Sequence, residues 1–189
     1  MNAPAADWDD ARLVERCLQG DERAWHVLVE RYKNLVYSIP LKYGAPHHDA
    51  ADIFQSVWLD LFNDLARLRD AGALQSWLIR VTTRKCYHWK RERDDAGAEM
   101  DEGEIEERPE EGRMPPEMLA EVEREQVVRE AMEELPPRCR EMIQLLFFEQ
   151  PPLRYAEVAQ RLGLAAGSIG FIRGRCLKRL KHILEERGF

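Results

Sequence analysis

The sequence has no long apolar run, no signal-peptide pattern and little cysteine. No stretch approaches the roughly 18–20 apolar residues of a membrane span, so we expect no membrane insertion. The start, MNAPAADWDD, is acidic and lacks the basic beginning and apolar centre of a signal peptide, which favours a cytoplasmic location. The 4 cysteines form no C-x-x-C pair and have no histidine at zinc-ligand spacing. They predict reduced, mostly buried thiols.

The chain also lacks positive charge overall, with a net charge of −7 over 189 residues, but the charge is segregated. Residues 21–93 and 127–189 each carry +3, whereas residues 94–126 carry −11. The total therefore hides two mildly basic blocks, and the acidic balance does not exclude binding to nucleic acid. The length allows one medium or two small domains.

Helical periodicity predicts an all-α fold of two small helical domains, residues 1–93 and 117–189. Between them, residues 94–116 combine dense negative charge with glycine and proline, which predicts a flexible acidic linker. This linker is either a simple tether or an acidic strand that lies in a basic groove of a partner. Helices are expected over residues 9–19, 22–43, 49–68 and 73–93, twice within 117–149 with a break at Leu135-Pro136-Pro137, over 155–162, and from about 168.

Residues 49–68 predict a helix with a wide buried stripe. The stripe consists of Ile53, Phe54, Val57, Trp58, Leu61, Phe62 and Leu65. The remaining face holds Asp52, Gln55, Leu59 and Asn63. One leucine on a polar face is ordinary, but beside Asp52 and Gln55 it is a candidate docking patch for another protein.

The next helix carries two stripes. Leu74, Trp77, Leu78 and Val81 are expected to face the preceding helix, with Trp77 at the border of the stripe. Arg80, Arg84, Tyr87 and Arg91 form a second stripe about a quarter turn away. Basic groups interleaved with aromatic rings suit phosphates and unstacked bases. The alternative is a solvated face whose aromatics complete the core.

The C-terminal part predicts a helix-turn-helix: a helix over 155–162, a turn at Gly163 and a longer helix from about Ser168. Before it, a helix is expected to pack Met142, Ile143, Leu145, Leu146 and Phe147. The core stripe of the last helix is Ile169, Ile172, Cys176, Leu180, Ile183 and Leu184, and its opposite face holds Phe171, Gly174, Arg175, Lys178 and His182. Such a face suits a DNA major groove, although helix-turn-helix geometry also occurs in non-binding bundles.

His47 and His48, with Asp49 and Asp52 nearby, raise the question of a metal site. Adjacent helical residues point in different directions, and the sequence shows no third ligand. We therefore expect no metal and no cofactor.

With these motifs in view, the chain resembles a bacterial RNA polymerase sigma factor of the sigma-70 family, extracytoplasmic function (ECF) group, over about residues 20–93 and 127–186. AADIFQSVWLDLF resembles the helix that docks on the clamp helices of the polymerase β′ subunit, which implies Asp52, Gln55 and Leu59 as polymerase contacts. SWLIRV resembles the Trp-Leu segment of the helix that melts and holds the −10 element. Residues 135–180 resemble the domain that reads the −35 element.

The resemblance implies two sets of DNA contacts. At the Leu68–Trp77 corner an unstacked base of the −10 strand is captured, and the candidate residues there and along the helix are Arg69, Asp70, Gln75, Trp77, Arg80, Arg84, Tyr87 and Arg91. The candidates for the −35 element are Ser168, Gly170, Phe171, Arg173, Gly174, Arg175 and Lys178.

The implied function is recruitment without covalent chemistry, so the chain is expected not to be an enzyme. Its implied partners are promoter DNA and core RNA polymerase, through the β′ clamp helices and the β flap, with the linker in the polymerase's RNA path. Whether an anti-sigma factor also binds the chain is left open. Two other classes remain: a stand-alone two-domain helix-turn-helix regulator, and a helical enzyme that uses His47 and His48 with carboxylates.

The sequence departs from the family pattern in three places. Arg84 and His88 stand where the family commonly has Asn and Asp, and Arg154 stands where a small hydroxyl residue often begins the helix-turn-helix. Phe171-Ile172 replaces a common Ser-Arg pair in the recognition helix. The promoter sequence that this chain recognises therefore cannot be inferred from the base contacts of the family.

Overall fold

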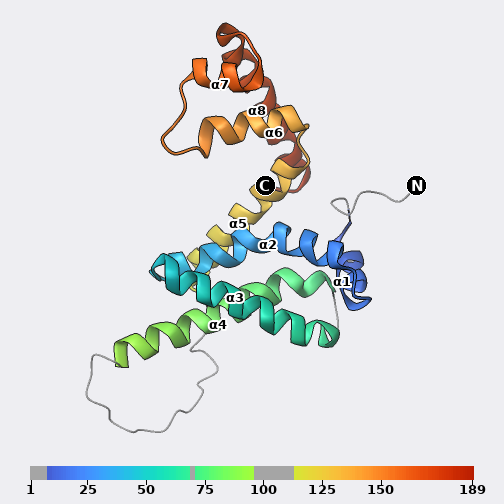
Figure 1. Ribbon diagram of the computed structural model, residues 1–189, viewed down its shortest axis with the longest axis vertical. Coiled ribbons are helices and arrows are strands. Elements are labelled where there is room, and N and C mark those ends of the chain that lie inside the picture. The colour runs from blue at the N-terminus through green and yellow to red at the C-terminus, as the bar shows by residue number, and fades with distance from the viewer. Residues whose placement is uncertain (1–7, 69–70, 96–112) are drawn as a thin grey trace. The chain divides into compact units, whose positions relative to one another are not determined.

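The computed structural model describes residues 8–68, 71–95 and 113–189, and within them all regular structure is helical, as predicted (Figure 1). Most of the predicted linker, residues 96–112, lies outside the described residues. None of the described helices combines the length and apolar character needed to cross a membrane. The elements are α1 (Asp10–Leu18), α2 (Glu22–Lys42), α3 (His47–Asp64), η2 (Leu65–Arg67), η3 (Ala71–Ala73), α4 (Leu74–Asp95), α5 (Pro116–Glu133), α6 (Pro137–Phe147), α7 (Tyr155–Leu162), η4 (Ala166–Ser168) and α8 (Ile169–Glu186).

The chain divides into two compact units, Met1–Val122 and Glu123–Phe189. In the first unit, α2 contacts α1, α3 and α4. The Asp21 carboxylate caps α2 by accepting from the backbone N–H groups of Arg23 (3.0 Å) and Ala24 (3.4 Å). The fully buried side chains of the core come from several elements: Leu13, Leu28, Leu35, Ile39, Leu61, Leu65, Leu74 and Leu78. This packing fixes which faces of α3 and α4 remain exposed.

Two ion pairs show that α3 and α4 run antiparallel. Lys85 lies 2.8 Å from Asp60, and Arg93 lies 2.9 Å from Asp49, so the end of α4 pairs with the start of α3. The predicted corner between these helices begins earlier than expected, because α3 ends at Asp64 and continues as the 3-10 turn η2.

The first turns of α5 also belong to the first unit. Val122 is buried there, and Met118 and Leu119 pack on the same core. Lys42 at the end of α2 forms an ion pair of 2.8 Å with Glu121. The N-terminal core therefore includes residues beyond the acidic segment.

The second unit contains the predicted helix-turn-helix, with Gly163 in the left-handed region (φ 62°) between α7 and α8. Arg140 connects the two sides of the Leu135-Pro136-Pro137 break, since it donates to the Met132 carbonyl oxygen (3.2 Å) and pairs with Glu133 (2.6 Å). One apolar cluster joins the end of α5 to α6 and α8, and a second joins α6, α7 and the start of α8. All six residues of the predicted core stripe of α8 pack in these clusters.

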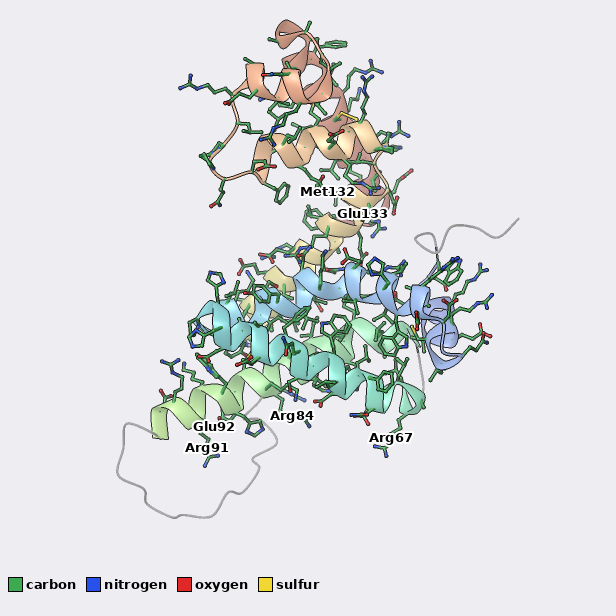
Figure 2. The ribbon with its side chains drawn as sticks, viewed as in Figure 1. Arg67, Arg84, Arg91, Glu92, Met132 and Glu133 are labelled. Atoms are coloured by element: carbon green, nitrogen blue, oxygen red, sulfur yellow. A yellow bond between two sulfur atoms is a disulfide. The ribbon has the colours of Figure 1, made fainter. Side chains whose placement is uncertain are left out.

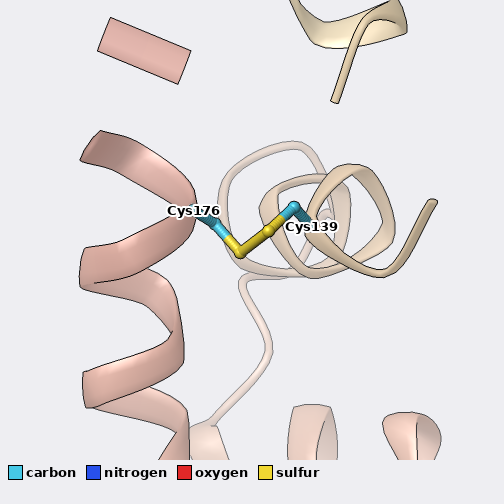
Figure 3. The surroundings of a disulfide bond; sticks show 2 residues. All are labelled: Cys139 and Cys176. Atoms are coloured by element: carbon cyan, nitrogen blue, oxygen red, sulfur yellow. A yellow bond between two sulfur atoms is a disulfide. The ribbon is translucent and has the colours of Figure 1, made fainter. Parts of the chain in front are cut away.

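The prediction of reduced thiols is wrong for two of the four cysteines. Cys139 on α6 and Cys176 on α8 form a disulfide with their Cα atoms 5.2 Å apart (Figure 3). The two residues are 37 positions apart, and only the packing of α6 against α8 brings them together. Cys17 and Cys86 are buried and free, as predicted.

Two aromatic residues assigned to buried stripes are exposed. Phe62 is 67% exposed, because it follows Gln55 by two helical turns and shares its polar face. Phe147 is 55% exposed, because it ends α6 five residues after the buried Met142 and points about 140° away from it. Both errors leave apolar surface where the sequence pattern predicted core.

Candidate functional site

The predicted docking face of α3 is exposed along its length. Asp52, Gln55, Leu59 and Asn63 are all exposed, and the Leu59 side chain keeps 64% of its surface. On the opposite side, Ile53, Val57 and Leu61 are buried in the core. The helix thus presents a carboxylate, an amide and a leucine along one side while its apolar side anchors it.

Next to this face, α2 and α3 form an apolar groove of about 500 Å³. It is lined by Trp25, Val29, Phe54, Gln55, Trp58, Leu59 and Phe62. The rings of Phe62 and Trp25 approach to 5.6 Å between centroids, and those of Phe54 and Trp58 to 5.8 Å. Gln55 and Leu59 belong both to the predicted docking face and to this groove, so the face is wider and more apolar than predicted.

The sequence pattern placed Phe62 in the buried stripe of α3 and therefore did not reveal the groove. The signal that could have revealed it is the angular width of the apolar set on α3. Phe62 lies about 180° around the helix from Ile53, which no single buried face can hold.

The basic stripe of α4 lies on its outer side. Arg80 and Arg84 are exposed, Tyr87 and Arg91 are half-buried, and Arg84 and Arg91 project from the same side of the helix (Figure 2). The exposed ring of His88 lies 6.1 Å from that of Tyr87. Cations and aromatic rings therefore alternate along one surface.

The predicted base-capture corner is only partly described. Arg69 and Asp70 lie outside the described residues. Trp77 is half-buried and packs against the core. It precedes Arg80 and Arg84 by about one and two helical turns, which puts it at the edge of the basic stripe. Gln75 is half-buried and lies about 140° around α4 from Arg80, so it does not share the basic stripe.

On the recognition helix the predicted residues separate into two groups. Gly170, Phe171, Gly174, Arg175 and Lys178 are all exposed. Arg173 is half-buried, and its guanidinium donates to the Tyr155 hydroxyl of α7. The Ser168 hydroxyl donates to the Ala165 carbonyl oxygen (2.7 Å), within its own turn.

The histidine pair lies at the start of α3. His47 Nδ1 is 3.2 Å from the Tyr37 hydroxyl, and His48 Nε2 is 3.3 Å from an Asp49 carboxylate oxygen. Over the described residues, no group of three or more His, Cys, Asp or Glu side chains is placed to hold a metal ion.

Comparison with known proteins gives two family matches. The family model Sigma-70 region 2 matches residues 28–95, and Sigma-70, region 4 matches residues 131–182. The chain is 30% identical over 167 residues to the ECF RNA polymerase sigma-E factor of Escherichia coli, covering 85% of this chain and 86% of the relative. The sigma-E factor of Haemophilus influenzae is 33% identical over 72 residues, 38% of each chain.

Among solved structures, CnrH in complex with the cytosolic domain of CnrY has 20% identity and a TM-score of 0.41, covering 94% of this chain and 97% of that one. The sigma factor RpoE in complex with the anti-sigma factor NepR from Bartonella quintana has 20% identity and a TM-score of 0.33, covering 84% and 94%.

Proposed function

The chain belongs to the ECF group of bacterial RNA polymerase sigma factors. We propose that three of its surfaces make separate contacts during transcription initiation: one with the polymerase, one with the −10 element and one with the −35 element. As a sigma factor it binds core RNA polymerase and directs promoter recognition, melting and initiation. The observation that carries this function is the match to region 2 and region 4 in that order within one chain. A stand-alone regulator is not favoured, because such a protein needs only the helix-turn-helix and would leave the region 2 match without a role.

The first surface is the polymerase-docking face formed by Asp52, Gln55, Leu59 and the adjoining α2–α3 groove. An apolar groove with a carboxylate and an amide beside it suits a helical partner, because helices dock with apolar side chains and use polar rims to fix register. We assign the β′ clamp helices to it.

The second surface is the basic stripe of α4, which we assign to the −10 element. Arg80, Arg84 and Arg91 neutralise phosphates, and Trp77 and Tyr87 supply rings against which unstacked bases pack. Arg69, Asp70 and Gln75 remain proposed contacts of the captured base. Extrusion of that base costs a few kcal/mol, which stacking and pocket contacts offset.

The third surface is the outer side of α8, which we assign to the −35 major groove through Ser168, Gly170, Phe171, Gly174, Arg175 and Lys178. Arg173 was predicted among these contacts, and its bond to Tyr155 supports a role in holding α8 against α7. Phe147 and Phe148, 55% and 64% exposed at the end of α6, are proposed to contact the β flap.

Several parts of the assignment concern the chain as a whole. We propose functional domains at residues 1–93 and 117–189 with residues 94–116 as linker, although the first turns of α5, up to Val122, pack with the N-terminal unit. We further propose action in the cytoplasm, and no catalytic or cofactor chemistry of its own. An anti-sigma factor is a further proposed partner.

Run-off transcription with purified core polymerase tests the function. We expect promoter-specific transcripts only when the chain is added, and a strong loss with Asp52→Arg. Glu15→Arg reverses the charge of an exposed residue of α1, away from the α2–α3 groove, and serves as the matched control. DNA footprinting by the chain alone, together with transcription that does not depend on it, would instead support a stand-alone regulator.

A further inference from the structure

The N-terminal half of α8 presents an aromatic ring to solvent. Phe171 is 72% exposed, the most exposed of the large apolar side chains in the described part of the chain. It stands where the family commonly has a small polar residue, so its role cannot come from the family pattern. Burying such a ring on another molecule is favourable, whereas leaving it in water is not.

Arg175 lies one helical turn further along the same face. Its guanidinium carbon is 5.9 Å from the centre of the Phe171 ring, and the side chain is exposed. Arg173 differs in position: its guanidinium lies 5.8 Å from the Tyr155 ring and donates to the Tyr155 hydroxyl. Arg173 therefore joins α8 to α7, while Arg175 and Phe171 form a ring–cation pair on the outer surface.

The surroundings of the pair favour DNA over an apolar protein surface. Gly170 and Gly174 flank Phe171 and are exposed, and a Cβ added at Gly174 would meet no atom within 4 Å. The helix backbone can thus approach another molecule closely. Within α8, five side chains are basic and two are acidic. An apolar partner would have to bury the charge of Arg175 together with the ring, which is costly, whereas a nucleic acid accepts both.

We propose that Phe171 and Arg175 act as one reading unit for two neighbouring base pairs of the −35 element. The Phe171 ring contacts the C5-methyl group of a thymine, and the guanidinium of Arg175 donates to O6 and N7 of a guanine. This inference rests on the proposed function of α8. Thymine and guanine present these groups in the major groove, where each base pair has a distinct pattern. The ring also restricts the rotamers of Arg175, so the arginine is partly ordered before it meets DNA.

Modified bases test the two contacts separately. A −35 sequence is first selected from a randomised library with the wild-type holoenzyme. Each selected thymine is then replaced by deoxyuridine, which lacks only the methyl group, and each guanine by 7-deazaguanine, which lacks N7. We expect wild type to lose about fourfold in affinity at one deoxyuridine, and Phe171→Ala to bind both versions equally. When the guanine is replaced by 7-deazaguanine, we expect wild type to lose about 5- to 150-fold in affinity. Arg175→Ala should bind both versions equally.

Leu177→Ala is the matched control, because Leu177 is an apolar residue of α8, 37% exposed, outside the predicted DNA face. It should keep the wild-type sensitivity to both modified bases. Wild-type binding that is indifferent to deoxyuridine at every selected thymine overturns the inference. If Phe171→Ala then lowers transcription equally on all promoters, the ring contacts protein. Wild-type run-off from the selected promoter verifies the proposed function independently, and its absence would overturn that function instead.

Discussion

Leu59 occupies the junction of the polar face of α3 and the apolar groove. Because its side chain is 64% exposed, its removal should change folding stability by no more than about 0.5 kcal/mol. Leu59→Ala should nevertheless raise the Kd for core polymerase by about 5- to 30-fold, which corresponds to roughly 1–2 kcal/mol. Leu18→Ala, at a 53% exposed leucine at the end of α1, is the control. Equal Kd values for both variants and wild type, measured by fluorescence titration, would contradict the docking assignment.

Cys86 makes the first unit sensitive to alkaline pH. Burial raises the pKa of the Cys86 thiol to about 12 from an ordinary value of 9.0. Since the folded state holds this proton more tightly than the unfolded state, the contribution to stability is complete below pH 9 and falls as the pH rises towards 12. Urea unfolding of the reduced protein should show a loss of up to about 1.4 kcal/mol per pH unit from this thiol.

Variants at two positions identify the titrating group. Cys86→Ala should reduce the alkaline loss without abolishing it, because burial and then the charge of Asp21 also raise the pKa of the Cys17 thiol, to about 11. Tyr43 lies nearby, and the pKa of its hydroxyl is also raised, first by burial and then by the charge of Cys86. A hydrogen bond with Thr83 acts in the opposite direction and lowers it. Tyr43→Phe should therefore leave the thiol-dependent part in place. An unchanged slope in Cys86→Ala would mean that other groups cause the loss.

At the scale of the element, the basic stripe of α4 should act through phosphates. Arg84→Ala should lower the slope of log affinity against log salt concentration for holoenzyme on promoter DNA by about 0.7–0.9. Arg23→Ala removes an exposed arginine near the start of α2 and should leave the slope unchanged. Early melting of Arg84→Ala with a wild-type slope would show that the stripe serves the fold.

The disulfide between α6 and α8 closes a loop across a sequence separation of 37 residues. In the loop-entropy model such a bond contributes about 4 kcal/mol to the stability of the second unit. Reductant should therefore lower the Tm of that unit, and Cys139→Ser with Cys176→Ser should melt at the reduced value with or without reductant. Cys17→Ala keeps the bond and should keep the response. A Tm that does not change after thiol titration confirms reduction would contradict this prediction.

For the whole molecule, the sequence predicted the helices and their order because the periodicity of apolar residues reports which faces are buried. It did not predict the α2–α3 groove, since Trp25 and Phe62 meet only after two helices pack. The Cys139–Cys176 bond was missed for the same reason: pairing depends on tertiary contact. The exposed face of α8 was predicted correctly, because the six core residues of that helix leave only one side for Phe171 and Arg175.

The acidic linker should matter for its charge, as residues 101–111 hold seven acidic side chains and one basic one. The test compares the wild-type chain with two variants, in which residues 101–111 are replaced by a scrambled segment of the same composition or by an equally long Gly/Ser/Lys segment.

Both replacements should leave the folding of the two units intact, because a segment so rich in charge buries little apolar surface. If the linker lies in a basic path of the polymerase, the scrambled chain should keep the wild-type yield of run-off transcripts. The Gly/Ser/Lys chain should lose yield, and it should bind core polymerase in a less salt-dependent way than wild type. Equal yields from all three chains would mean that the segment only tethers the two units.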